Sequence, residues 1–498
     1  MNLMMLLEMV SSSFGERGAL AHPDRRLSYA ELFAGAGAAR DAIVETGAER
    51  VAFLDEASPA LPLALFGSAW AGVPFAPLNY RLSEAELDGL LERVAPAFLV
   101  TDAERARALA GRPGIFPVAS EDFQQSALAA PQRERDEWPM DPDAIAVLLF
   151  TSGTTGPPKT AVLRHGHIVS YVLGTVEFAG ADEGDAALVS VPPYHIAGIA
   201  ALASSVYAAR RVVQLPHFAA SDWLSRAHEE SVTHAFVVPT MLARIIDTFE
   251  AGGHEMPSLQ SLSYGGGKMP LSVIERAMSL FSETSFTNAY GLTETSSTIT
   301  LLGPDEHRAA AESEDEAVKR RLTSVGKALP SVELGIRGDE GELLPAGQRG
   351  EICVRGEQVS GEYLEQGSRL DAEGWFPTRD AGWLDEEGYL FLDGRIDDVI
   401  VRGGENMSPG EIEDVLLAHP AIRDAAVVGV PDEQWGEAVA AAIVLRSGAS
   451  AGVEEVQQWV KDRLRSSRVP ERIEFFDELP YNETGKLLRR RVREQLGG

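Results

Sequence analysis

The stretch Thr151-Ser-Gly-Thr-Thr-Gly-Pro-Pro-Lys159 directly follows a strand-like segment, Leu148-Leu-Phe150. Its backbone amides and hydroxyl groups can converge on phosphate oxygens, and Lys159 adds a positive charge. A Walker-A loop needs a glycine directly before its lysine, but Pro158 stands there and removes an amide donor. The stretch therefore predicts a phosphate-binding loop that differs from the P-loop of NTPases, and a plain linker is the alternative.

Strand-like and helix-like segments alternate on both sides of this loop. Short apolar runs at 51–55, 97–101 and 234–238 predict strands, and Ser28 with Glu31 forms a capping-box pattern that predicts the start of a helix. Such alternation is typical of α/β sheets. Beyond residue 320, glycine-rich turns separate strand-like pieces, which indicates an antiparallel, barrel-like section.

The pattern changes again past Arg395. Ser408 offers an N-cap, Pro409 fits the first helical position, and Glu411 follows at the third, so a helix is expected to begin there. The last hundred residues or so then read as a separate small α+β unit. We predict an α/β protein with a large N-terminal domain over 1–394 and a small C-terminal domain over 395–498.

Composition excludes several classes of protein. With 45% hydrophobic and 24% charged residues, the chain of 498 residues is typical of soluble globular proteins. Its net charge of -31 argues against general nucleic-acid binding, which needs a positive face. The single cysteine, Cys353, excludes an intrachain disulfide and predicts a small core residue. No apolar run approaches the ~20 residues of a membrane span, and no signal-peptide pattern opens the chain, so we expect a cytoplasmic protein.

Five further motifs follow the loop in a fixed order. They are Tyr264-Gly-Gly-Gly267, Asn288-Ala-Tyr-Gly-Leu-Thr-Glu294, Thr378-Arg-Asp380, Gly394-Arg-Ile-Asp397 and Gly485-Lys486. With the loop, they resemble the adenylate-forming superfamily, which comprises acyl- and aryl-CoA synthetases, peptide-synthetase adenylation domains and luciferases. The chain is most similar to fatty- or aryl-acid acyl-CoA synthetases, and the motifs span residues 148 to 490.

The resemblance implies an ATP-dependent ligase. The family activates a carboxylic acid to an acyl adenylate with ATP and Mg²⁺, and a thiol then displaces AMP. Coenzyme A is the expected acceptor, and an acyl-carrier protein is the alternative. A non-enzymatic ligand sensor is the competing hypothesis, and a luciferase activity has no separate signature. The resemblance leaves the oligomeric state, monomer or homodimer, undecided.

An ATP site in the large domain is implied by the same likeness. The loop is expected to hold the β- and γ-phosphates, Tyr290 to stack on adenine, and Asp380 to bind the ribose. Glu294 is the implied Mg²⁺ ligand and a catalytic residue, which suits a hard cation. The full set implied for ATP is Thr151, Ser152, Gly153, Thr154, Thr155, Lys159, Gly265, Gly266, Gly267, Asn288, Ala289, Tyr290, Gly291, Thr293, Asp380 and Arg395.

Two implied roles belong to the C-terminal part. Lys486 resembles the family's catalytic lysine, whose charge would offset the charge that develops during adenylation. Asp397 matches the hinge about which the family's small, mobile domain rotates between the two half-reactions. We therefore expect Lys486→Ala to abolish adenylation and largely to spare thioester formation from supplied acyl adenylate.

Acyl and CoA sites are implied as well. His195 resembles a residue that gates the acyl site and is a candidate for catalysis. Phe236 stands where an amino-acid-activating site carries an aspartate, so an aliphatic or aromatic acid fits better than an amino acid. The acyl set is His195, Phe236, Val238, Gly266 and Gly291. The CoA set is Gly403, Gly404, Glu405, Trp435 and Arg468, although Trp435 is nearly as well explained by core packing.

Two residues depart from the family pattern. Thr160 and Arg379 each stand where glycine is usual. A left-handed backbone at either position would cost on the order of 1 kcal/mol or more with a side chain present. Neither change removes a functional side chain, so activity is expected to survive.

Overall fold

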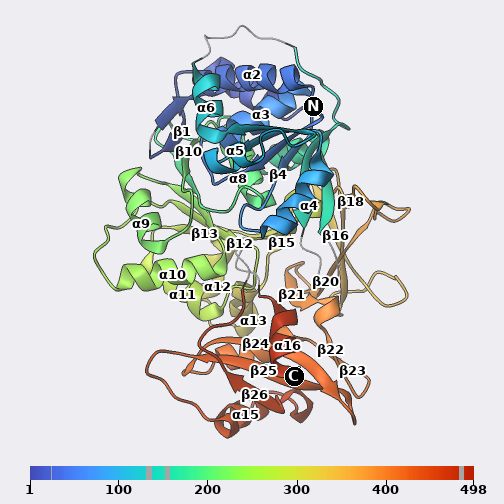
Figure 1. Cartoon of the computed structure of the whole chain (residues 1–498). Coiled ribbons are helices and arrows are strands. Elements are labelled where there is room, and N and C mark those ends of the chain that lie inside the picture. Colours follow the sequence, from blue (N-terminus) through green and yellow to red (C-terminus); the bar gives the residue numbers. More distant parts are fainter. Residues whose placement is uncertain (24, 130–136, 152–157, 482–486, 498) are drawn as a thin grey trace.

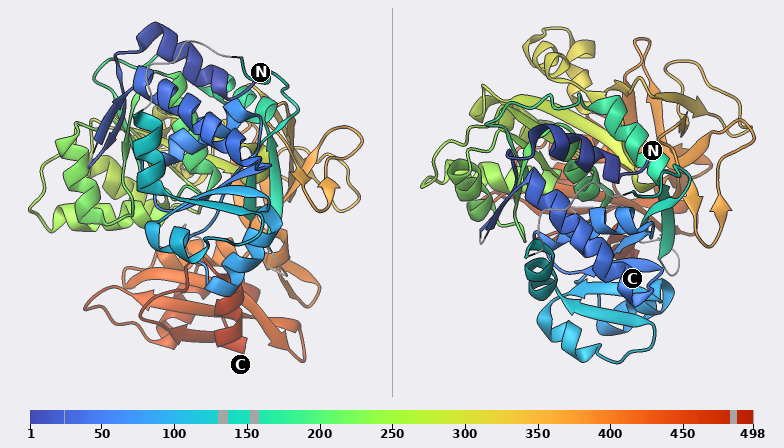
Figure 2. Two further views of the ribbon diagram at one scale, coloured as in Figure 1. Left: turned by 45° about the horizontal axis from the view of Figure 1, so that its top comes forward. Right: turned by 90° about the horizontal axis from the view of Figure 1, so that it is seen from above.

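Two α/β sheets, an antiparallel sheet and a smaller C-terminal unit build the chain (Figure 1). The computed structural model describes residues 1–23, 25–129, 137–151, 158–481 and 487–497. The first helices and the C-terminal unit lie at opposite ends of the molecule in Figure 1, and the left view of Figure 2 shows the same arrangement. The predicted α/β fold class is confirmed.

The first sheet contains β7 and β8, the two strands that precede and follow the glycine-rich loop and form a hairpin. β7 and β8 of this hairpin are antiparallel, with Phe150 opposite Thr160 and Thr151 opposite Lys159. The strands from β7 through β4, β3, β5 and β6 are parallel. In spatial order the eight strands are β19 (Gly367–Ser368), β18 (Glu362–Tyr363), β8 (Lys159–Arg164), β7 (Ile145–Thr151), β4 (Phe75–Pro77), β3 (Arg50–Leu54), β5 (Ala97–Thr101) and β6 (Ile115–Ala119).

The second sheet has nine strands and aligns the carboxyl ends of four of them. β9, β11, β12 and β13 are parallel neighbours, so their C-terminal ends meet at one edge. In spatial order the strands are β15 (Lys327–Ala328), β14 (Ser297–Leu302), β13 (Ser285–Leu292), β12 (Ser261–Gly265), β11 (His234–Val237), β9 (Ala186–Val189), β10 (Arg211–Gln214), β1 (Gly18–His22) and β2 (Arg25–Ser28).

Helices cover both sheets. The capping box predicted at Ser28 and Glu31 is confirmed, because the Ser28 hydroxyl accepts from the Glu31 amide at the start of α2. The helices of this part are α1 (Met4–Phe14), α2 (Tyr29–Thr46), α3 (Ala60–Ala71), α4 (Glu84–Val94), α5 (Ala103–Ala108), α6 (Ser120–Leu128), α7 (His165–Thr175), α8 (Ile196–Tyr207), α9 (Ala220–Glu229), α10 (Pro239–Glu250), α11 (Leu271–Leu280), α12 (Pro304–Glu312) and α13 (Glu316–Lys319), with 3-10 turns η1 (Thr293–Thr295) and η2 (Arg320–Thr323).

An antiparallel four-stranded sheet follows, as the glycine-rich turns predict. Its strands are β16 (Val332–Arg337), β17 (Gly350–Gly356), β20 (Phe376–Leu384) and β21 (Leu390–Arg395). Cys353 lies in β17 with 1% of its surface exposed, and burial raises its pKa to about 11. The cysteine is thus a protonated core residue, as predicted.

The C-terminal unit, residues 400–497, has a sheet of its own. Its strands are β22 (Ile400–Arg402), β23 (Glu405–Met407), β24 (Ile422–Asp432), β25 (Gly436–Leu445) and β26 (Arg472–Phe475), with helices α14 (Pro409–Leu417), α15 (Val453–Lys461) and α16 (Arg489–Gly497) and the turn η4 (Ser466–Arg468). The short turn η3 (Ile396–Asp398) connects β21 to β22. The change of sheet therefore occurs between Arg395 and Ile400. The domain limits at 394 and 395 and the hinge at Asp397 stay predictions.

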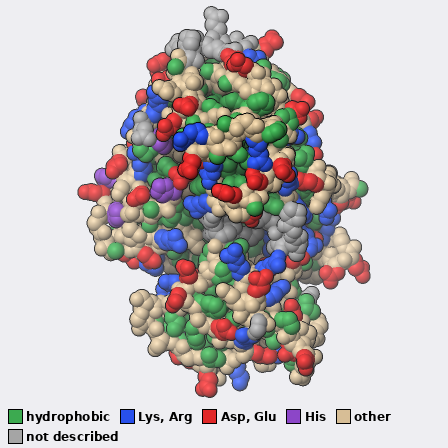
Figure 3. Space-filling view, in the orientation of Figure 1, with side chains coloured by type: hydrophobic (Ala, Val, Ile, Leu, Met, Phe, Trp, Pro, Cys, Tyr) green, Lys and Arg blue, Asp and Glu red, His purple; other side chains and the backbone are tan. Residues whose placement is uncertain are grey.

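Charge is spread over the surface. On the face shown in Figure 3, acidic and basic side chains are interspersed. The described helices include none that is both long and apolar enough to cross a membrane.

Candidate active site

A cavity of about 50 Å³ opens where the carboxyl ends of β9, β11, β12 and β13 meet. Open α/β sheets bind their ligands at this edge of the strands. Among the described residues, no Asp, Glu, Lys or Arg lines the cavity, whose wall consists of Val191, Pro192, His195, Ile196, Ala197, Phe236, Val238, Met241, Gly266, Ala289, Gly291, Ser297 and Thr298. All five residues predicted for acyl binding lie in this wall, although their contact with an acyl group stays a prediction.

His195 begins the helix beside the cavity. It is the N-cap of α8, and its Nδ1 accepts a hydrogen bond from the Ala197 amide at 3.2 Å. A ring nitrogen that accepts carries no proton, so the neutral imidazole has its proton on Nε2. A proton on Nε2 is the kind of donor that could orient a carboxylate.

Two glycines of the predicted motifs are required by close backbone contacts. A Cβ at Gly265 would lie 2.1 Å from the Ala289 oxygen, and one at Gly291 would lie 1.8 Å from the Ser297 oxygen. The strand pair β13–β14 changes register at Gly291. Gly291 in the cavity wall and Gly265 directly before Gly266 of that wall therefore let neighbouring backbone approach closely, and no other residue fits at either position without a backbone shift.

Tyr290, Asp380 and Arg395 form a polar chain. The Tyr290 hydroxyl donates to Asp380 Oδ2 at 2.7 Å, and Arg395 Nε lies 3.1 Å from Asp380 Oδ1. Burial and the adjacent Asp380 carboxylate raise the pKa of Tyr290 well above its usual value, so the hydroxyl stays a donor. The predicted ribose carboxylate is thus fixed from two sides, while the stacking of Tyr290 on adenine stays a prediction.

Asn288 has a partner within the fold. Its side-chain amide is buried and donates to the Ser324 oxygen at 2.9 Å. This contact ties β13 to the segment before β15. A direct role of Asn288 at ATP, like those of Ala289 and Gly267, stays a prediction.

Glu294, the predicted Mg²⁺ ligand, lies in the turn η1 with 9% of its surface exposed. Its Oε1 accepts a hydrogen bond from the Tyr363 hydroxyl at 2.5 Å, and the Lys159 ammonium lies 5.2 Å from the Tyr363 ring centre. Among the described residues, no three His, Cys, Asp or Glu side chains gather as a metal cluster. A single carboxylate suits Mg²⁺, which takes one or two protein carboxylates together with phosphate oxygens.

Tyr363 and Arg93 were not predicted from the sequence. Arg93 donates to the Pro158 oxygen at 2.8 Å and to Thr160 Oγ1 at 2.5 Å, so it supports the hairpin end from α4. Neither residue stands in a glycine-rich or charged motif, and each reaches its partners over long distances in sequence. Three-dimensional contacts alone reveal them.

The two departures from glycine have different outcomes. Thr160 lies buried in the extended strand β8, and its hydroxyl donates to Glu365 at 2.6 Å, so no backbone strain arises there. Arg379 has a φ of 64°, which is the left-handed region in which a side chain is costly. Its guanidinium lies 2.5 Å from Asp397 Oδ1, at the predicted hinge.

Some of the predicted residues lie outside the described residues. These are Ser152, Gly153, Thr154 and Thr155 of the loop, and Lys486. At the described ends of the loop, Thr151 Oγ1 donates to the Lys159 oxygen at 3.3 Å. Thr293 lies in η1 directly before Glu294.

The residues predicted for CoA lie together on the C-terminal unit. Gly403 and Gly404 both have positive φ, at the tip of the β22–β23 hairpin, and Gly403 lies against the Trp435 ring. Trp435 is 44% exposed, which excludes the core-packing alternative. Arg468 is paired with Glu405 and Glu411. Binding of CoA by this cluster stays a prediction.

Comparison with known proteins agrees with this geometry. Residues 7–364 match the AMP-binding enzyme family, and residues 411–486 match the C-terminal domain of AMP-binding enzymes. The chain belongs to the AMP-binding enzyme family. Its motifs and its fold are therefore those of one enzyme family, and the predicted resemblance is confirmed.

Relatives of this AMP-binding enzyme match over nearly its whole length. A fatty acid–[acyl-carrier-protein] ligase of Streptomyces coeruleorubidus is 32% identical and covers 95% of this chain and 92% of its own. A 2-succinylbenzoate–CoA ligase of Bacillus subtilis is 33% identical, with coverage of 97% and 96%. The structure of O-succinylbenzoate coenzyme A synthetase from Bacillus subtilis in complex with ATP and magnesium ion superposes with a TM-score of 0.82, at 31% identity and 99% coverage of both chains.

Proposed function

We propose that this protein activates a carboxylic acid with ATP and Mg²⁺ and passes the acyl group to coenzyme A. In the first step a carboxylate oxygen attacks the α-phosphorus of ATP, and pyrophosphate leaves. In the second step the thiol sulfur attacks the acyl carbon, AMP leaves, and the thiol proton is released. The observation that carries the proposal is the apolar cavity at the sheet edge, which adjoins the motif from Asn288 to Glu294.

The described residues divide the work of the first step. Asp380, held by Tyr290 and Arg395, accepts hydrogen bonds from the ribose hydroxyls, and Lys159 attracts phosphate oxygens. Mg²⁺ bound to Glu294 and the phosphates would neutralise the charge on the departing pyrophosphate. His195 Nε2–H orients the acid at the mouth of the cavity. The proposal also includes Lys486 as the catalytic lysine and Asp397 as the hinge of the C-terminal unit.

The cavity favours an acid with an uncharged, largely apolar tail. Val238, Met241 and Phe236 supply apolar walls, and no Lys or Arg lines the described wall. A second carboxylate on the tail would lose its hydration without gaining a partner, which is costly. Fatty and aryl monocarboxylic acids are therefore the proposed substrates.

Coenzyme A is the proposed acceptor, and the pantetheine of a carrier protein is the second candidate. Two left-handed glycines beside an exposed tryptophan suit a thin pantetheine arm and an adenine ring. The first relative above is a carrier-protein ligase by name, which favours testing that acceptor too. We further propose a cytoplasmic enzyme, because its single buried cysteine is typical of a reducing compartment.

Acid-dependent exchange of labelled pyrophosphate into ATP tests the proposal. Fatty and aryl acids with uncharged tails should support exchange, whereas 2-succinylbenzoate and malonate, which carry a second carboxylate, should support at least tenfold less exchange. Thioester should then form on addition of CoA, and the same reaction with a pantetheinylated carrier measures the second acceptor. If no acid of the panel supports exchange, the proposed enzyme activity is refuted. If the dicarboxylates are preferred, only the proposal of an uncharged acyl tail is refuted.

A further inference from the structure

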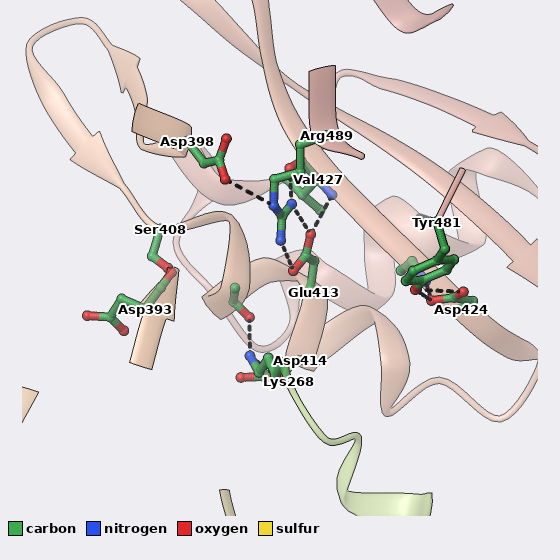
Figure 4. Close-up of polar contacts among 12 residues, drawn as sticks. Lys268, Asp393, Asp398, Ser408, Glu413, Asp414, Asp424, Val427, Tyr481 and Arg489 are labelled. Atoms are coloured by element: carbon green, nitrogen blue, oxygen red, sulfur yellow. Dashed lines mark hydrogen bonds and ion pairs between the residues drawn. The ribbon is translucent and has the colours of Figure 1, made fainter. Parts of the chain in front are cut away.

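Lys268 reaches from the nucleotide side of the large part of the chain to the C-terminal unit. It directly follows the glycines Gly265 to Gly267. Its ammonium lies 2.6 Å from Asp414 Oδ1 and donates to the Gly410 oxygen at 3.1 Å, both on α14 (Figure 4). One side chain thus connects the segment between β12 and α11 with the first helix of the C-terminal unit.

Further close contacts surround this ion pair, between α14 and β21 and between α14 and Lys268. Ser408, which precedes α14, donates through its hydroxyl to the Asp393 oxygen at 2.5 Å instead of capping its own helix, as the sequence predicts for it. A Cβ at Gly410 would lie 3.3 Å from the Asp393 oxygen and 3.4 Å from Lys268 Nζ. Glycine at 410 therefore lets α14 approach β21 and Lys268 closely.

The β22–β23 hairpin carries three of the residues predicted for CoA, Gly403, Gly404 and Glu405, and its described ion pairs lie inside the C-terminal unit. Arg402 contacts Glu471 and the Ser467 oxygen, and Arg468 contacts Glu405, all of them within the C-terminal unit. The element that meets Lys268 in this structure is α14, through Asp414 and Gly410. A rotation that brought the hairpin to the acyl cavity would separate Lys268 from Asp414.

We propose that Lys268 is a positioning residue that holds the C-terminal unit in the orientation for adenylation and must release it before thioester formation. This rests on the proposed two-step function. The Lys268 and Asp414 side chains are 39% and 54% exposed, so water and salt weaken their attraction. A contact of this strength holds one orientation without preventing the exchange that the second step needs.

The orientation can be measured without any substrate. Cys353 is buried, so cysteines introduced by Ser279→Cys and Ser447→Cys, both exposed, take spin labels selectively. Pulsed-EPR distances should show one dominant orientation. Lys268→Met should move the ratio of orientations by about fivefold, as expected for losing a partly exposed ion pair and one hydrogen bond. High salt should shift the parent in the same direction and leave Lys268→Met nearly unchanged.

The half-reactions give the second readout. Lys268→Met should slow pyrophosphate exchange while thioester formation from supplied acyl adenylate stays equal or rises. The exchanged pair Lys268→Asp with Asp414→Lys should lie closer to the parent than either single variant. Lys319→Met, which breaks an exposed pair with Glu316 on α13, is the matched control and should change neither readout.

Unchanged distances in Lys268→Met, or an equal fall of both half-reactions, would overturn the proposal for Lys268. A parent protein that exchanges no pyrophosphate with any acid would instead refute the proposed function. The distance measurement judges the contact by itself, so the two failures are distinguishable.

Discussion

Glu294→Gln is expected to lower acid-dependent pyrophosphate exchange by about 10²-fold or more, because a metal ion at a transferring phosphate supplies several kcal/mol. Glutamine keeps the shape of the side chain but removes the negative charge that would bind Mg²⁺. The required Mg²⁺ concentration should rise in parallel. Thioester formation from supplied acyl adenylate should change little, since no pyrophosphate leaves in that step. Mg²⁺ titrations of both half-reactions measure the difference.

Tyr363→Phe should change the Mg²⁺ dependence in the same direction as Glu294→Gln, but by less. It keeps the ring beside Lys159 and removes the hydroxyl that donates to Glu294. Loss of a partner that orients a metal ligand costs about 10–100-fold, so this variant should fall between the parent and Glu294→Gln. Glu357→Gln, on an exposed carboxylate, should behave like the parent. Wild-type Mg²⁺ dependence in Glu294→Gln would contradict the metal role.

Arg489→Met is expected to destabilise the C-terminal unit by about 3–5 kcal/mol, the usual cost of leaving one member of a buried ion pair alone. Arg489 lies 2.8 Å from Glu413 Oε2 and donates to the Val427 oxygen at 2.8 Å, and Glu413 is 5% exposed (Figure 4). Hydrogen exchange of peptides from β24 and β25 measures the loss locally. Replacing both partners, as Arg489→Met with Glu413→Met, should recover most of it.

The destabilisation should depend on pH in a defined direction. Burial raises the pKa of Glu413, but the charge and hydrogen bonds of Arg489, the Val427 amide and the charge of Lys268 together outweigh burial and hold the pKa below its usual value. In the parent, Glu413 therefore stabilises the fold above the unfolded pKa of about 4.3, and this is lost as pH falls through the lower folded value. In Arg489→Met, burial, the largest of the influences on this carboxyl, is opposed only by the Val427 amide and the more distant charge of Lys268 and therefore raises the pKa, so the variant should recover as pH falls from neutral. A deficit that grows toward acid pH would contradict this account.

Sequence reasoning worked where a motif is local. The capping box at Ser28 and the strand at 97–101 were predictable because their signals lie within a few residues. The five acyl candidates were predictable from motif resemblance, and the sheet edge then brings them into one cavity. For Arg379, the sequence indicated only that a side chain would be costly if the backbone were left-handed at this usual glycine position, and the structure shows that it is left-handed.

Other parts of the site needed the fold. Tyr363 meets Glu294 because β18 pairs with β8, and no spacing along the chain encodes that contact. Lys268 meets Asp414 only in a particular orientation of the C-terminal unit. The role of Ser408 changed because Asp393 lies close enough to take its hydroxyl. Long-range packing decided all three.

The position of Cys353 has a chemical consequence for an enzyme of this kind. A mixed anhydride of a carboxylic acid and AMP acylates thiolates readily, and a reactive sulfur near the active site would be modified by the enzyme's own intermediate. The chain has one sulfhydryl group, locked inside β17 with its pKa raised to about 11. It stays protonated and inaccessible at neutral pH. The protein thus has no accessible thiolate that could react with its acyl adenylate, and it does not inactivate itself by acylation of its own cysteine.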